Sequence, residues 1–163
     1  QVLEASDNLQ VIEIGVPAEH MTTIDHDLVL PNKTINRNRI FNGQTFCHHQ
    51  LKNATWQPWR IADFEARFTG INAATNGLAD VKVVRPKTGK TSTNWMSHTT
   101  DILFSFILEG SLVLEVVEEG THLLKSGDAF VMPPDQKSRI TDCSTDLAFL
   151  EISLPGAFKT ILS

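Results

Sequence analysis

The residue of this sequence that is most suited to chemistry is His98, in the segment Trp95-Met-Ser-His98. An imidazole gains and loses its proton near physiological pH, so His98 could act as a general acid or base, or anchor a ligand carboxylate. Asp101, the nearest acidic residue in the sequence, lies on an expected bend and is no obvious partner. The alternative is a histidine that is hydrogen-bonded within the fold and does no chemistry.

A second cluster, Cys47-His-His49, contains residue types that bind metals. Adjacent residues of a strand point to opposite faces, so only alternate members could converge, and the spacing does not favour a metal site. Cys47 and Cys143 are too few for a disulfide framework. We expect both to pack as small apolar residues in a reducing cytosol, which predicts a cytoplasmic protein.

Composition and charge exclude two classes of partner. The chain has 163 residues, the length of one domain, and a net charge of −5. Nucleic-acid and anionic-membrane binding need clustered cations, so we expect no nucleic-acid partner and no membrane partner. The longest nearly uncharged apolar run, residues 102–108, is far shorter than the ~20 residues of a membrane span. Because the chain begins with Gln1 rather than Met, we expect that something has been lost at its front.

Most of the chain has the sequence pattern of β-strands, and such strands must position His98 and the other candidate side chains. Five segments rich in β-branched or aromatic residues are bounded by Gly, Pro, Asn, Asp or Ser. They are residues 10–16, 79–84, 112–117, 129–132 and 147–154. Evenly spaced short strands with turn signals between them indicate an all-β sandwich or barrel. A short C-terminal helix is expected over residues 156–162.

The two ends of the chain resemble each other. Residues 6–22 align without gaps on residues 144–160, with matching Ser, Leu, Glu, Ile, Pro and Thr and matching apolar positions. This similarity indicates an internal duplication, and it predicts that residues 1–23 contribute a strand resembling the end of a preceding unit. A strand this apolar would aggregate if isolated, so a sheet must pair it.

Residues between the first expected strand and the later ones show no regular alternation of apolar and polar residues. Residues 24–60 contain Trp56 and Trp59, which would be exposed if the segment did not lie against something. We therefore expect a connecting arm that packs on the barrel formed by residues 61–163.

Several motifs between residues 94 and 155 occur in a fixed order. A hydrophobic strand ends in Leu108-Glu-Gly110, a charged hairpin follows, and Gly127-Asp128 precedes Pro133 by a short strand. This combination resembles the cupin superfamily, and the resemblance implies an all-β, jelly-roll β-barrel. It also indicates a small bacterial single-barrel type, or the C-terminal half of a protein with two cupin barrels.

The resemblance also implies a metal site, from which this chain departs. Many cupins bind a divalent metal through three His and one Glu or Gln. The corresponding positions here are Met96, His98, Leu103 and Ser138, so His98 is the only retained family ligand position. A thioether is a poor ligand for hard divalent ions, and leucine supplies none. We therefore expect no metal and no other cofactor, with a divalent metal as the disfavoured alternative.

These positions predict a ligand pocket instead, lined by Trp95, Met96, His98, Leu103 and Ser138. A mostly apolar cavity with two polar points suits a small organic molecule that is partly apolar. The leading hypothesis is a cupin-domain protein that binds such a ligand or acts structurally beside a catalytic cupin. The alternative is a metal-dependent dioxygenase or isomerase. No catalytic residue is assigned, and the expected macromolecular partner is a second copy or a second cupin unit.

Overall fold

The computed structural model describes residues 4–16, 19, 21, 26–27, 29, 31, 33–89 and 91–163. The chain divides into two compact units, residues 1–35 and residues 36–163. The described helices and strands all lie in the second unit.

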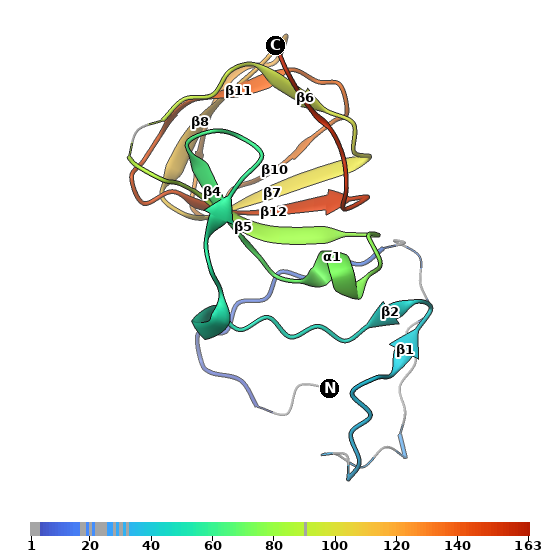
Figure 1. Cartoon of the computed structure of the whole chain (residues 1–163). Helices are drawn as coiled ribbons and strands as arrows, with labels where there is room; N and C mark the ends of the chain where they lie inside the picture. Colours follow the sequence, from blue (N-terminus) through green and yellow to red (C-terminus); the bar gives the residue numbers. More distant parts are fainter. Residues whose placement is uncertain are drawn as a thin grey trace. The chain divides into compact units, whose positions relative to one another are not determined.

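Two antiparallel sheets enclose the core of the second unit (Figure 1). The larger sheet has six strands in the order β10-β7-β12-β5-β4-β3. Its strands are β3 (Gln57–Pro58), β4 (Phe64–Phe68), β5 (Asp80–Pro86), β7 (Ile102–Glu109), β10 (Ala129–Met132) and β12 (Ala148–Leu154). The two sheets do not close into a continuous barrel, and the arrangement is a jelly roll.

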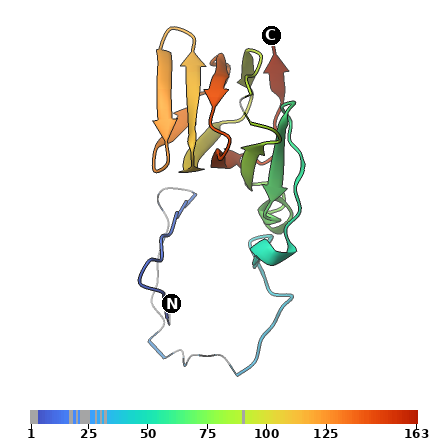
Figure 2. The same ribbon diagram turned by 90° about the vertical axis from the view of Figure 1, so that its left-hand side faces the viewer.

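The smaller sheet has five strands in the order β13-β6-β11-β8-β9. Its strands are β6 (Met96–His98), β8 (Ser111–Val116), β9 (Gly120–Lys125), β11 (Ser138–Cys143) and β13 (Thr160–Leu162). Figure 2 shows the β8–β9 hairpin at one edge of this sheet and β13, with the C-terminus, at the other.

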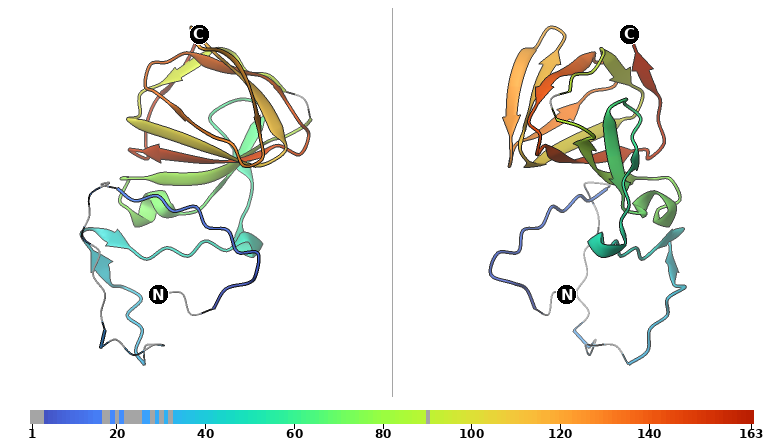
Figure 3. Two further views of the ribbon diagram at one scale, coloured as in Figure 1. Left: turned by 180° about the vertical axis from the view of Figure 1, so that it is seen from behind. Right: turned by 60° about the vertical axis from the view of Figure 1, so that its left-hand side comes forward.

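The remaining described elements are short. They are β1 (Ile40–Phe41), β2 (Gln44–Thr45), a single 3-10 turn (Leu51–Asn53) and the helix α1 (Ile71–Ala74). The strands β1 and β2 form a two-stranded sheet of their own among the described residues, and α1 lies beside β5 (Figure 3).

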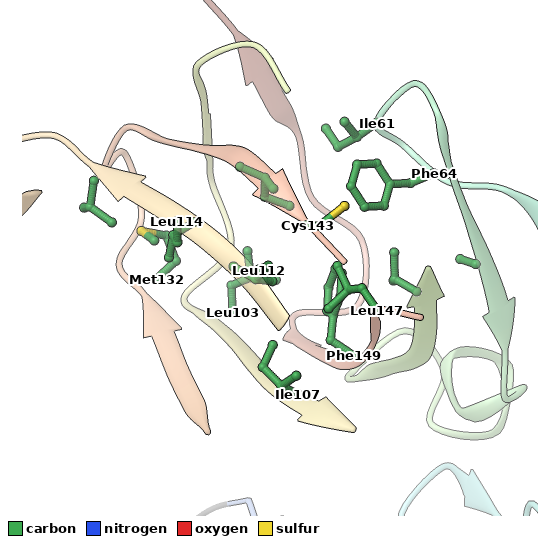
Figure 4. Close-up of a cluster of buried hydrophobic side chains, with 14 residues drawn as sticks. Ile61, Phe64, Leu103, Ile107, Leu112, Leu114, Met132, Cys143, Leu147 and Phe149 are labelled. Atoms are coloured by element: carbon green, nitrogen blue, oxygen red, sulfur yellow. The ribbon is translucent and has the colours of Figure 1, made fainter. Parts of the chain in front are cut away.

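Alternation of side chains along the strands builds the core. On β7, Leu103, Ser105 and Ile107 are buried between more exposed neighbours, as expected for a strand with one face against the core. The inner faces of both sheets contribute to one cluster of buried apolar residues (Figure 4). The cluster contains Ile61, Phe64, Ala66, Val84, Leu103, Ile107, Leu112, Leu114, Val116, Met132, Ile140, Cys143, Leu147 and Phe149.

Four of the five strand predictions are confirmed with small shifts of their ends, as β5, β8, β10 and β12. The helix predicted over residues 156–162 is wrong. Residues Thr160–Leu162 instead form β13, which pairs with β6. The backbone groups of β6 need a partner on that side, and this long-range pairing outweighs a weak local helix preference.

The strand predicted at residues 10–16 is not formed, and no strand is assigned anywhere in residues 4–16. Its apolar side chains are exposed, from 42% at Ile12 to 72% at Val11. Residues 1–3, 17, 18, 20, 22 and 23 of the predicted segment lie outside the described residues. The origin of residues 1–23 in a preceding unit stays a prediction, as do the boundaries of the arm and the barrel.

Two hairpin glycines offer a matched test of the fold. Gly110 has a φ of +70°, and a Cβ there would lie 2.3 Å from Ser144 Oγ and 2.8 Å from the backbone nitrogen of Leu147. Gly120 has a φ of +89°, but a Cβ at this position would have nothing within 4 Å. Both substitutions by alanine carry the strain of a left-handed backbone, and only Gly110→Ala adds a clash with backbone.

We therefore predict that Gly120→Ala lowers the free energy of unfolding by about 1 kcal/mol and Gly110→Ala by about 3 kcal/mol or more. Urea denaturation of both variants measures the difference. Equal losses would contradict the close packing of Gly110 against residues 144–147.

Candidate functional site

A cavity of about 50 Å³ lies between the inner faces of the two sheets. Its apolar lining consists of Met96, Leu103, Leu112, Leu114, Phe130, Met132, Ile140 and Phe149. Its polar lining consists of Trp59, Arg60, Ser97, His98, Ser105, Ser138, Glu151 and Thr160. The cavity is thus an apolar space with a polar wall, the usual composition of a small-molecule site.

Four of the five residues predicted from the sequence line this cavity: Met96, His98, Leu103 and Ser138. Met96 and Ser138 are direct partners in the pairing of β6 with β11, and Leu103 comes from the opposite sheet. That the cavity binds a ligand stays a prediction.

Trp95, the fifth predicted residue, is not part of the described cavity lining. It directly precedes β6, and alternation directs it away from the side on which Met96 and His98 lie. The guanidinium of Arg139 lies 4.6 Å from the centre of its ring and also pairs with Glu115, at 2.7 Å. Trp95 therefore belongs to a surface stack and not to the cavity.

His98 is held in one tautomer by the backbone. Its Nε2 lies 3.0 Å from the carbonyl oxygen of Met132, and its side chain is almost completely buried. Because a carbonyl only accepts hydrogen bonds, Nε2 must carry the hydrogen and donate it. Burial lowers the pKa of His98 below its ordinary value of 6.5, and it outweighs the backbone groups of Met132 and Thr100, which raise the pKa. In the neutral ring with its hydrogen on Nε2, Nδ1 is an acceptor that has no hydrogen-bond partner among the described residues.

The most strongly charged part of the cavity, the ion pair of Arg60 with Glu151, was not predicted from the sequence. Two parallel hydrogen bonds join them, with Nη1 to Oε1 at 2.5 Å and Nη2 to Oε2 at 2.6 Å. Arg60 lies in the turn between β3 and β4, where its guanidinium stacks on Trp59 at 4.1 Å and on Phe158 at 5.0 Å from the ring centres. Glu151 lies on the inner face of β12 and is 2% exposed.

Two further charges lie behind Glu151. Lys82, its register partner on β5, places Nζ 3.4 Å from Glu151 Oε1 and 2.8 Å from Asp80 Oδ2. The four side chains form a row of alternating charge in which each carboxylate has a cation, and all but the partly exposed Arg60 are buried. Burial alone would raise the pKa of Glu151, but Arg60 and Lys82 together lower it, so the side chain is an anion at neutral pH.

A signal for Glu151 was present in the sequence. An acidic residue at an inward position of an otherwise apolar strand, as in Leu150-Glu-Ile152, implies a buried charge that needs a cation. No such signal marks Arg60, which follows a tryptophan in an irregular segment.

Polar atoms without partners collect around the same cavity. Among the described residues, five buried side-chain atoms have no hydrogen-bond partner, and four of them belong to cavity-lining residues. These four are Trp59 Nε1, Arg60 Nε, His98 Nδ1 and Thr160 Oγ1. Buried polar groups are normally hydrogen-bonded, so a concentration of exceptions at one cavity favours a polar ligand there.

A wider groove of about 420 Å³ adjoins the cavity and shares the lining residues Leu114, Phe130 and Met132 with it. The groove lies between the β8–β9 hairpin and β10, and it adds the polar side chains of Glu119, His122 and Gln136. The small cavity and the groove together offer space for a molecule larger than the cavity alone would hold.

The cluster of Cys47, His48 and His49 does not form a metal site in this structure. Cys47 Sγ lies 3.3 Å from the carbonyl oxygen of Thr69. Within the part of the chain that the structure describes, no group of three or more His, Cys, Asp or Glu side chains could hold a metal ion. The described residues also contain no helix with the length and apolar character needed to cross a membrane.

Comparison with known proteins gives a family match and several structural matches. The family model of the cupin domain matches residues 82–152. KdgF from a Halomonas species is similar in structure, with a TM-score of 0.56, 16% identity, and coverage of 67% of this chain and 94% of that one. No curated protein matches the chain.

Two further solved structures are similar. The polyketide cyclase RemF from Streptomyces resistomycificus has a TM-score of 0.58 and 13% identity, and the match covers 73% of this chain and 87% of that one. A sugar phosphate isomerase from Silicibacter pomeroyi has a TM-score of 0.55 and 19% identity, with coverage of 71% and 81%. At these identities the similarity demonstrates a shared fold.

The buried row of charges predicts a large effect for Glu151→Gln. This change leaves Arg60 and Lys82 without their shared anion, and breaking a buried ion pair costs about 3–5 kcal/mol. Glu115→Gln is the matched control, because Glu115 pairs with Arg139 at the surface and should contribute about 1 kcal/mol or less. Urea denaturation at neutral pH compares them, and similar losses would contradict a structural role for the buried pair.

The lowered pKa of His98 predicts a pH dependence of stability. Below pH 6.5 the unfolded chain binds a proton at this residue, whereas the folded protein does not until the pH falls to its lowered pKa. The free energy of unfolding must therefore decrease with falling pH in that window, and His98→Asn should reduce this slope. His122→Asn, at an exposed position, is the control. An unchanged slope in His98→Asn would contradict the assigned neutral state.

Proposed function

We propose that the cavity of this cupin-domain protein binds a small, neutral, polar organic molecule without a metal ion. The observation that carries this proposal is the set of four unpartnered polar atoms around one cavity. A ligand there would gain hydrogen bonds that no described residue of the protein competes for.

The donor set around the cavity does not fit a divalent metal. Of the side chains at the family's ligand positions, Met96 and Leu103 offer a thioether and no ligand, and Ser138 offers a neutral hydroxyl. The Nε2 of His98 is engaged by Met132. The carboxylate of Glu151, also at the cavity wall, is engaged by Arg60 and Lys82. These features support a degenerate metal site.

The unpartnered polar atoms around the cavity indicate which chemical groups the ligand carries. Arg60 Nε and Trp59 Nε1 carry hydrogens, and His98 Nδ1 carries a lone pair. A carbonyl oxygen would accept from the first two, and a hydroxyl group would donate to the third. The charge of Arg60 is already balanced by Glu151, so a neutral molecule suits the cavity better than an anion. The cavity holds only a few non-hydrogen atoms, and the rest of a longer ligand would lie in the adjoining groove.

The bare Nδ1 of His98 favours one second candidate, an enzyme that uses acid–base chemistry without a metal. A neutral imidazole in the cavity can accept a proton from a carbon or oxygen atom of the ligand. The Arg60 Nε–H group could then stabilise negative charge on a neighbouring carbonyl oxygen. Structural neighbours include enzymes described as a cyclase and an isomerase, which supports a catalytic use of such a cavity.

Two arginines provide a matched pair of variants for testing ligand binding. Arg60 and Arg139 each stack on a tryptophan and pair with a glutamate, but only Arg60 lines the cavity. We predict that short-chain hydroxy aldehydes and hydroxy ketones raise the melting temperature more than the corresponding hydroxy acids do. Arg60→Lys should weaken binding by about 10- to 100-fold, the effect of one charge-assisted hydrogen bond, and Arg139→Lys should not.

Thermal-shift titration and calorimetry measure these affinities, and elemental analysis of protein purified without chelators accompanies them. Equal affinities in both arginine variants would contradict the proposed site. One tightly bound transition metal per chain, or binding that is lost on adding EDTA, would contradict the metal-free proposal and favour a metal-dependent dioxygenase or isomerase.

A further inference from the structure

The apolar segment at residues 9–16 is not assigned to a strand, although its composition is that of a buried strand. Leu9, Val11, Ile12, Ile14 and Val16 are each between 42% and 72% exposed. Five exposed apolar side chains within so short a segment mark a surface that another element normally covers.

The similarity between the two ends of the chain indicates which kind of element would cover residues 9–16. Residues 9–16 align without gaps on residues 147–154, which contain β12. Leucine, glutamate and isoleucine are identical at three positions, and valine or isoleucine replaces phenylalanine or leucine at three others. In this alignment, Glu13 takes the place of Glu151.

The surroundings of β12 in this barrel are specific. It is hydrogen-bonded to β5 on one side and to β7 on the other. Phe149 and Glu151 face the cavity, and Glu151 is bound by Arg60 and Lys82. A glutamate at this position of an apolar strand is costly to bury unless a cation accompanies it. Glu13 is exposed here, and if its segment were buried in the same way, it would need both flanking strands and a cation.

We propose that residues 9–16 form the β12-equivalent strand of a second cupin barrel, in which Glu13 is the buried cavity anion. A second copy of this chain does not offer this position, because its own residues Ala148–Leu154 fill it. The partner is therefore a cupin unit that lacks its own strand there, with two unpaired strand edges and an inward-facing arginine or lysine.

Chimeras of the full chain test whether residues 9–16 carry the information for this position. In the in-register chimera, residues 10–16 replace residues 148–154, so that Glu13 falls at position 151. In the shifted chimera, residues 9–15 replace residues 148–154, and the glutamate falls at position 152 on the opposite face. Because loss of Phe149 could unfold both, a second pair of chimeras keeps this phenylalanine.

We expect the in-register chimera with Phe149 to keep a cooperative thermal transition by circular dichroism, and the shifted one to lose it. If both chimeras that keep Phe149 unfolded cooperatively with the same midpoint, or if neither showed a cooperative transition, the proposal would be overturned. Amide hydrogen exchange of the unmodified chain adds a second measurement. Residues 9–16 should exchange rapidly at every protein concentration, and protection that increases with concentration would identify a second copy as the partner and overturn the proposal.

Discussion

The ion pair between Arg60 and Glu151 is the interaction on which the interior of this barrel depends. A carboxylate that is 2% exposed among apolar side chains would be costly without a cation. Arg60 supplies that cation from the turn between β3 and β4, and Lys82 supplies a second from β5. The pair therefore ties the β3–β4 turn to the centre of the larger sheet and gives an otherwise apolar cavity a polar wall.

The character of the cavity follows from this arrangement. Because the two charges of the pair offset each other, the cavity carries no net charge from them to attract an ion. Burial keeps His98 neutral, and its bond to Met132 fixes which nitrogen remains available. The ligand that we propose would be recognised by hydrogen bonds and shape, whereas a cupin with a full set of metal-binding side chains would use a metal ion.

Features with a local cause could be predicted from the sequence, and features with a distant cause could not. Alternating apolar residues indicated the strands, and the motif positions indicated four residues that line the cavity, Met96, His98, Leu103 and Ser138. The pairing of Arg60 with Glu151 joins residues 91 positions apart, and only the folded topology brings them together. The C-terminal strand was missed for the same reason, because its partner, β6, lies far back in the sequence.

The protonation state of His98 decides whether the cavity is neutral and free of metal, and nitrogen-15 NMR of the labelled imidazole ring measures it. At neutral pH we expect a protonated Nε2 and an unprotonated Nδ1, with chemical shifts that do not change when EDTA is added. Nδ1 should shift when a hydroxyl-bearing ligand binds. A ring that is protonated on both nitrogens at neutral pH, or shifts that show a metal-bound nitrogen lost on chelation, would contradict a neutral, metal-free cavity.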